Sequence, residues 1–119
     1  MVTKKSFRDQ IRGALSQSGW EVVQIDGEPD WWADEHWTIS STTRAYGYTL
    51  VVSFLVDPQH DGPRKSSAIW EIPVGKTRPR DWLDHDTRIA VLEMQKGHFA
   101  EKLDSFIREI DRHRDLLRS

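Results

Sequence analysis

The chain has 119 residues, of which 37% are hydrophobic and 30% charged, a composition typical of one folded globular domain and unlike that of a disordered segment. Seventeen Lys and Arg against nineteen Asp and Glu give a formal net charge of -2, which excludes a general attraction for polyanions such as nucleic acid. The absence of cysteine excludes disulfide frameworks, thiolate catalysis and cysteine-ligated metal centres.

The sequence carries no targeting signal that we can identify. Charged and polar residues interrupt its first segment, so that no apolar signal-peptide stretch is present. No run reaches the roughly 18 apolar residues that a membrane span requires. We therefore expect a cytoplasmic protein without membrane contact, and the lack of cysteine fits a reducing compartment.

The chain begins with a predicted helix. Its apolar stripe has four-residue spacing and consists of Phe7, Ile11 and Leu15. Thr3 or Ser6 can cap the start of this helix. Ser18-Gly19 ends it, because glycine accepts the left-handed conformation that is common just past a helix.

Two strands are predicted next. Residues 20–25 are β-branched and partly alternating, and the turn signal Asp26-Gly27 follows them. Residues 26–35 combine turn formers, carboxylates and two adjacent tryptophans, which predicts an irregular acidic loop. Residues 36–42 alternate, with Trp37 and Ile39 on one face, and predict a half-buried strand.

The middle of the chain predicts three further strands. Residues 48–56 are apolar on both faces, which indicates a central strand, and the chain breakers of residues 57–65 predict a hairpin loop. A fourth strand carries one apolar face made of Ala68, Trp70, Ile72 and Val74. Residues 75–87 predict a second long loop. Residues 89–94 fit a fifth strand or the start of the last helix, and Gly97 favours the strand.

The last segment is a predicted amphipathic helix. Its apolar stripe recurs at spacings of four, three, four and seven and consists of Phe99, Leu103, Phe106, Ile110 and Leu117, with Ile107 alongside. The predicted polar face consists of Glu101, Lys102, Asp104, Arg108, Glu109, Asp111, Arg112, Arg114 and Asp115.

This order of elements predicts one α+β domain over residues 1–119. We expect an antiparallel meander sheet of four or five strands with the N-terminal and C-terminal helices packed on one face. The layout resembles that of small bacterial adaptor, chaperone-like and immunity-type proteins. No motif ties the chain to one family, and a layout does not define a function.

Carboxylates and imidazoles lie near one another in two loops. Asp34, Glu35 and His36 offer ligands for a cation, and Asp84 and His85 could join them if the loops met in space. The chain lacks the ligand spacing of a calcium loop or of a His-Glu-x-x-His helix, and it lacks a Gly-x-Ser-x-Gly elbow. We therefore assign no catalytic residue, metal or cofactor. A small-molecule or metal-dependent enzyme remains the alternative hypothesis.

A short basic stretch could contact phosphates, and it consists of Lys76, Arg78 and Arg80. Trp82 could stack on a base. The carboxylates that follow directly, Asp81, Asp84 and Asp86, would repel a polyanion. A weak single-stranded nucleic-acid binder is therefore a third hypothesis, against which the charge pattern argues.

The chain contains six tryptophans, more than is usual for its length. Three of them, Trp20, Trp37 and Trp70, fall on predicted strands, and the other three, Trp31, Trp32 and Trp82, fall in predicted loops. An exposed indole is a frequent contact in protein interfaces, although the loop with adjacent Trp31 and Trp32 could also fold back as a lid over the sheet.

The leading hypothesis is therefore a non-catalytic protein-binding or adaptor module, which could also associate with itself as a homodimer. We expect the partner to meet the uncovered face of the sheet between residues 26–36 and 75–87. The predicted partner-binding residues are Trp31, Trp32, Trp37, Arg78, Arg80 and Trp82.

Overall fold

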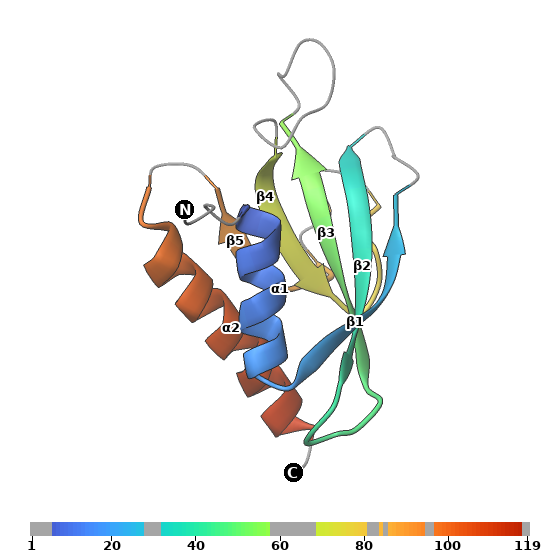
Figure 1. Ribbon diagram of the computed structural model, residues 1–119. Helices are drawn as coiled ribbons and strands as arrows, with labels where there is room; N and C mark the ends of the chain where they lie inside the picture. The colour runs from blue at the N-terminus through green and yellow to red at the C-terminus, as the bar shows by residue number, and fades with distance from the viewer. Residues whose placement is uncertain are drawn as a thin grey trace.

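Strands that are neighbours along the chain pair with one another to form one antiparallel sheet of five strands, in the order β1-β2-β3-β4-β5. The computed structural model describes residues 6–27, 32–57, 69–80, 84, 86–94 and 97–117. Its elements are α1 (Phe7–Gln17), β1 (Trp20–Asp26), β2 (Ala33–Ser41), β3 (Thr49–Val56), β4 (Ile69–Gly75), β5 (Arg88–Glu93) and α2 (Phe99–Leu116). Both helices lie on one face of the sheet, which confirms the predicted α+β architecture (Figure 1).

The hydrophobic core lies between the two helices and the sheet. The helices contribute Ile11, Leu15, Phe106, Ile107 and Ile110. The strands contribute alternate residues of one face, which are Trp37, Ile39, Leu50, Val52, Phe54, Ile72, Val74, Ala90 and Leu92. The core sits on β3, which has a partner strand on each side and is buried on both faces, as its apolar composition predicts.

Local signals fix both ends of α1. The Ser6 hydroxyl accepts a hydrogen bond from the Asp9 backbone N–H at 3.2 Å and so caps the first turn. Gly19 follows the helix with φ of +86°, a conformation that favours glycine. A Cβ at this position would also lie 2.7 Å from the Thr43 hydroxyl, so the β2–β3 turn packs directly against the end of the helix.

The buried side chain of Arg114 joins the first and last helices. Its Nη2 donates to the Ser18 carbonyl at 2.8 Å, and its Nη1 donates to the Gly19 carbonyl at 3.1 Å. The guanidinium also lies 4.7 Å from the centre of the Trp20 ring, which is favourable for a cation over an aromatic face. Asp111 completes the group, because it accepts hydrogen bonds from both Arg114 and Trp20. Arg114 therefore supplies donors to the carbonyls of the two residues that follow α1, and the Gly19 carbonyl also accepts the Thr42 backbone N–H at 2.8 Å.

The structure corrects four details of the sequence analysis. Arg114 was predicted on the polar face of the last helix but is 2% exposed, whereas Leu117 was predicted on the apolar stripe and is 43% exposed. Residues 33–35 were predicted in a loop and instead begin β2. Trp70 was predicted on the apolar face of β4 but is only half-buried beside a register shift between β3 and β4.

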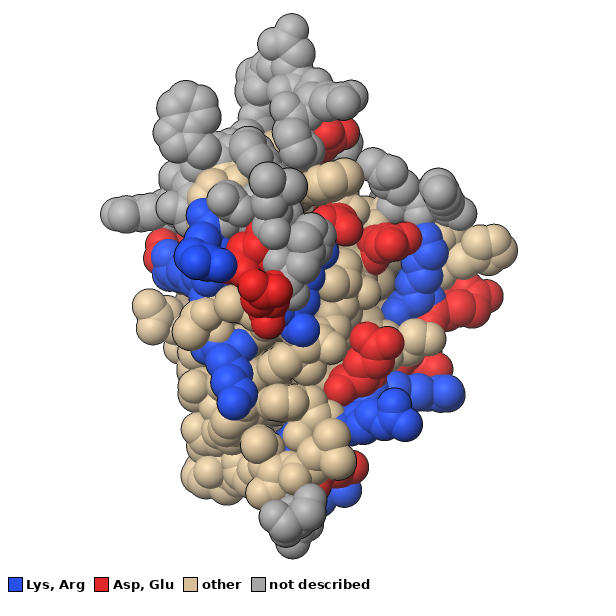
Figure 2. All heavy atoms as spheres, turned by 180° about the vertical axis from the view of Figure 1, so that it is seen from behind, with Lys and Arg blue, Asp and Glu red and all other residues tan. Residues whose placement is uncertain are grey.

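The face of the sheet opposite the helices was expected to be uncovered, and it is only partly so. Arg78, which follows β4, forms an ion pair with Asp26 at the end of β1, so the segment after β4 crosses this face behind the strands (Figure 1). Next to that end of β1, the buried side chains of His36 and Ser53 form a hydrogen bond, with His36 Nδ1 and Ser53 Oγ 2.8 Å apart. Away from the crossing segment the face remains open and mostly uncharged, as Figure 2 shows. Its open strand residues there are Thr38, Ser40, Thr49 and Val51.

Neither helix of the described chain has both the length and the apolar character needed to cross a membrane.

Replacing Arg114 by Leu should lower the free energy of unfolding by about 3 kcal/mol, because the Ser18 and Gly19 carbonyls and Asp111 would lose a shared donor. Arg112→Ala, an exposed change on the same helix, is the control and should alter stability by less than about 0.5 kcal/mol. Urea denaturation measures both. Equal midpoints for the two variants would contradict the role of Arg114.

Gly75→Ala should destabilise the fold by about 1–3 kcal/mol, because the new Cβ would lie 2.2 Å from the Thr87 carbonyl oxygen, which is backbone. Gly13→Ala is the matched change inside α1, where a Cβ meets nothing within 4 Å. It should stabilise the protein by about 0.5–1 kcal/mol, since alanine is the better helix former. Thermal denaturation would therefore shift in opposite directions for the two variants.

Candidate binding surface

The predicted tryptophan surface is only partly within the described residues. Trp31 and Trp82 lie outside them. Trp32 is half-buried, with its ring edge-on to His36 at 5.4 Å between ring centres. Trp37 is 3% exposed and packs against Phe54 in the core, with its indole N–H donated to Glu35 at 2.9 Å. Trp37 therefore serves the core in this structure and is not available at the surface.

The two predicted arginines are exposed but already have partners. Arg78 pairs with Asp26, as described above. The backbone N–H of Arg80 donates to Asp84 Oδ2 at 2.8 Å, and its Nε lies 3.3 Å from the same oxygen. These contacts, led by the backbone N–H, lower the pKa of the Asp84 carboxyl although its burial acts in the other direction. Both arginines of the basic stretch are thus paired with carboxylates of their own chain.

The carboxylates and histidines of the enzyme hypothesis do not converge where the structure describes them. Asp34 and Glu35 both pair with Arg8 of α1, at 2.7 Å in the case of Asp34. His36 is buried against Ser53, and His85 lies outside the described residues. No group of three His, Asp or Glu side chains with metal-binding proximity occurs within the described ranges.

A second polar pair joins Tyr48, the residue before β3, to His113 of α2. The Tyr48 hydroxyl and His113 Nε2 are 2.9 Å apart, and the rings of the two residues are tilted against each other. Burial lowers the pKa of His113, and the positive charge of Lys76 lowers it further. Burial also raises the pKa of Tyr48. A neutral imidazole whose Nε2 accepts a hydrogen bond from the Tyr48 hydroxyl satisfies both groups.

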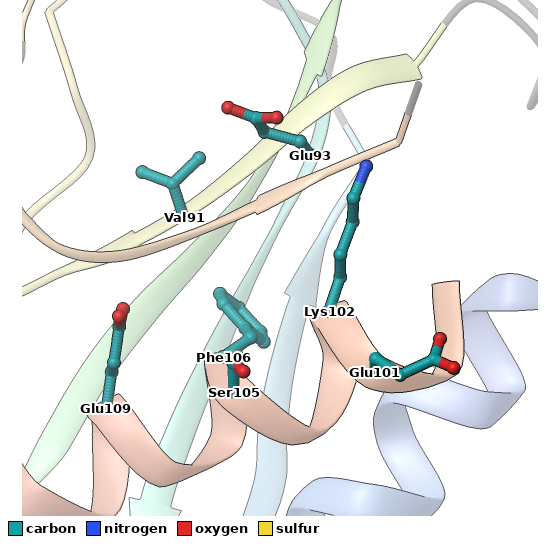
Figure 3. A pocket seen from close by; sticks show the side chains of 7 residues that line it. All are labelled: Val91, Glu93, Glu101, Lys102, Ser105, Phe106 and Glu109. Atoms are coloured by element: carbon teal, nitrogen blue, oxygen red, sulfur yellow. The ribbon is translucent and has the colours of Figure 1, made fainter. Parts of the chain in front are cut away.

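A groove runs between the edge strand β5 and helix α2 (Figure 3). It has a volume of about 280 Å³, and its lining residues are Val91, Glu93, Glu101, Lys102, Ser105, Phe106 and Glu109. Phe106 lies at the floor, with only 1% of its surface exposed, and Val91 is half-buried on the strand. In Figure 3 the Phe106 and Glu109 side chains point from α2 towards β5.

Along this groove, the outward backbone groups of β5 have no strand partner among the described residues. Its register against β4 is uninterrupted from Ala90 to Glu93, and the next residue, Met94, donates its N–H to the Trp70 carbonyl at 3.0 Å. Hydrogen-bonded and non-hydrogen-bonded pairs alternate in an antiparallel ladder. The N–H and C=O groups of Val91 and Glu93 therefore point away from β4, and no strand of the described chain pairs with that edge.

This groove was not predicted from the sequence. The spacing of Glu101, Ser105 and Glu109 places them on one face of the last helix, which was a usable signal. The pattern of α2 could not show that β5 would lie beside that face, because the pairing of strand and helix is a tertiary contact.

Comparisons of the chain with protein-family models, with curated proteins and with solved structures found no match.

The lowered pKa of His113 predicts a loss of stability in mild acid. The imidazole of His113 binds a proton less tightly in the folded state than in the unfolded state. Its contribution to the free energy of unfolding is therefore complete above about pH 6.5 and falls as the pH drops below that value. Wild-type protein should therefore lose stability relative to His113→Phe between about pH 7 and pH 5. Lys76→Gln should make that loss smaller. Urea denaturation across this range measures the difference, and parallel curves for wild type and His113→Phe would contradict the prediction.

Proposed function

We propose that the protein is a non-catalytic protein-binding module that holds an extended segment of a partner in the groove between β5 and α2. The observation that carries the proposal is the outward backbone edge of Val91 and Glu93, which pairs with no strand of the described chain and lies beside the groove that α2 borders. An extended peptide can add to such an edge as a further strand, with main-chain hydrogen bonds giving affinity and the adjacent groove giving specificity.

The other edge strand, β1, is less suited to the addition of a partner strand than β5. β1 contains a register shift between Val22 and Gln24, and its last residue, Asp26, is paired with Arg78. Bulges and charged contacts of this kind discourage strand addition. β5 keeps a regular register along Ala90–Glu93 and therefore presents the better template.

The enzyme alternative gains nothing from the described residues. Arg8 pairs with Asp34 and Glu35, Arg80 pairs with Asp84, and Ser53 pairs with His36. A surface built from the loop tryptophans Trp31, Trp32 and Trp82 stays a prediction. The absence of cysteine supports a reducing compartment such as the cytoplasm as the place of action.

A blocking substitution tests the groove. Ser105 is exposed on its wall, so Ser105→Trp should fill the groove while leaving the core unchanged. Ser16→Trp places the same side chain on the exposed face of α1 and is the matched control. Wild type and Ser16→Trp should enrich common sequences from a displayed library of random nine-residue peptides, and those peptides should lose at least about tenfold in affinity for Ser105→Trp. Peptides that bind all three proteins equally, or no enrichment at all, would contradict the proposal.

A further inference from the structure

The charges around the groove narrow the class of partner. Three glutamates and one lysine line it, and the glutamates are Glu93, Glu101 and Glu109. None of the three takes part in the ion pairs shown among the described residues. Among those residues, the groove lining therefore has an excess of negative charge, with three carboxylates against one ammonium group.

The position of Glu93 strengthens this point. Glu93 lies directly opposite Glu71 across the β4–β5 ladder, and like charges in that position destabilise a sheet. Arg88 offsets the charge of Glu71, since its Nη2 lies 3.2 Å from the Glu71 carboxylate, but it forms no such pair with Glu93. Glu93 alternates with the core residues Ala90 and Leu92, so its side chain points away from α2 (Figure 3), and a positive group on that side of the β5 edge would offset its charge.

The spacing of the helix carboxylates matches an extended chain. Glu101 and Glu109 are eight residues apart on α2, and at 1.5 Å per residue this corresponds to about 12 Å along the helix axis. A strand advances about 3.3 Å per residue, so a strand that runs along the helix axis covers the same distance in about four residues. Side chains four positions apart in a strand point to the same face, and the one midway between them does so too.

We propose that the partner segment is a basic, extended polypeptide with two Lys or Arg residues four positions apart and a small apolar residue midway between them. This inference rests on the proposed binding function of the groove. The two cations pair with Glu101 and Glu109, the small apolar residue lies over the exposed Ser105 between them, and the backbone pairs with Val91 and Glu93. A second copy of this chain does not supply that segment from its own basic stretch, because Arg78 and Arg80 are paired with Asp26 and Asp84.

Synthetic peptides test this partner class. The probe is a capped nine-residue peptide of threonine with valine at its centre and lysine two positions to either side, and the matched peptide carries glutamate in place of lysine. Fluorescence anisotropy at low and high salt measures binding. Wild type should bind the lysine peptide at least about tenfold more tightly than the glutamate peptide, and salt should weaken the binding.

Charge reversal in the protein gives the decisive comparison. Glu101→Lys with Glu109→Lys should lose at least about tenfold in affinity for the lysine peptide and gain affinity for the glutamate peptide. Glu21→Lys with Asp86→Lys changes the net charge equally at exposed positions outside the groove lining and should bind like wild type. All four positions are exposed, and circular dichroism verifies that the variants fold.

The outcomes separate this inference from the proposed function. If the two charge-reversed proteins bind the lysine peptide equally, the groove does not select basic segments. If library peptides lose affinity for Ser105→Trp but show no excess of Lys and Arg, the groove binds peptides of another class, and only the present inference is overturned. A dimer of the wild-type chain that Glu101→Lys with Glu109→Lys dissolves would assign the groove to self-association and also overturn it.

Discussion

The fold depends on a positive charge placed in its interior. Arg114 gives up nearly all contact with water, which is costly for a guanidinium, and recovers that cost through hydrogen bonds to Ser18, Gly19 and Asp111 and through contact with the Trp20 ring. Each of these partners comes from a segment that must be in place for the others to fit. The end of α1, the start of β1 and the last turns of α2 are thereby held in one arrangement, which gives the sheet its covered face.

Most of the architecture could be predicted from local patterns. Residues 48–56 are apolar on both faces because β3 has a neighbour on each side, and the spacing of Phe99, Phe106 and Ile110 reflects a helix with one buried side. Gly19 marked the end of the first helix because its positive φ is a local property of the backbone. Such features depend on periodicity and turn chemistry, which are written in adjacent residues.

The functional surface was much less accessible, because it depends on contacts between distant segments. Arg114 was predicted on the polar face of the last helix because arginine is a charged residue. Its burial depends instead on hydrogen bonds to carbonyls 95 and 96 positions earlier in the chain, which the helix pattern does not show. Trp37 was assigned to a binding face because alternation alone does not say which side of a strand the helices cover. The candidate site at the edge of β5 depends on α2 lying beside it and on Glu93, which forms no ion pair with the described residues.

The distance along the chain between Arg114 and Gly19 has a consequence for how the molecule assembles. Each strand pairs with the one made just before it, so the sheet can grow in step with synthesis. The contact of Arg114 with the end of α1 closes a loop of 95 residues, so it forms only after the last turns of α2 have been synthesised. A nascent or truncated chain that lacks this final turn would carry an undocked first helix, and the exposed apolar stripe of that helix is the kind of surface that chaperones and proteases recognise.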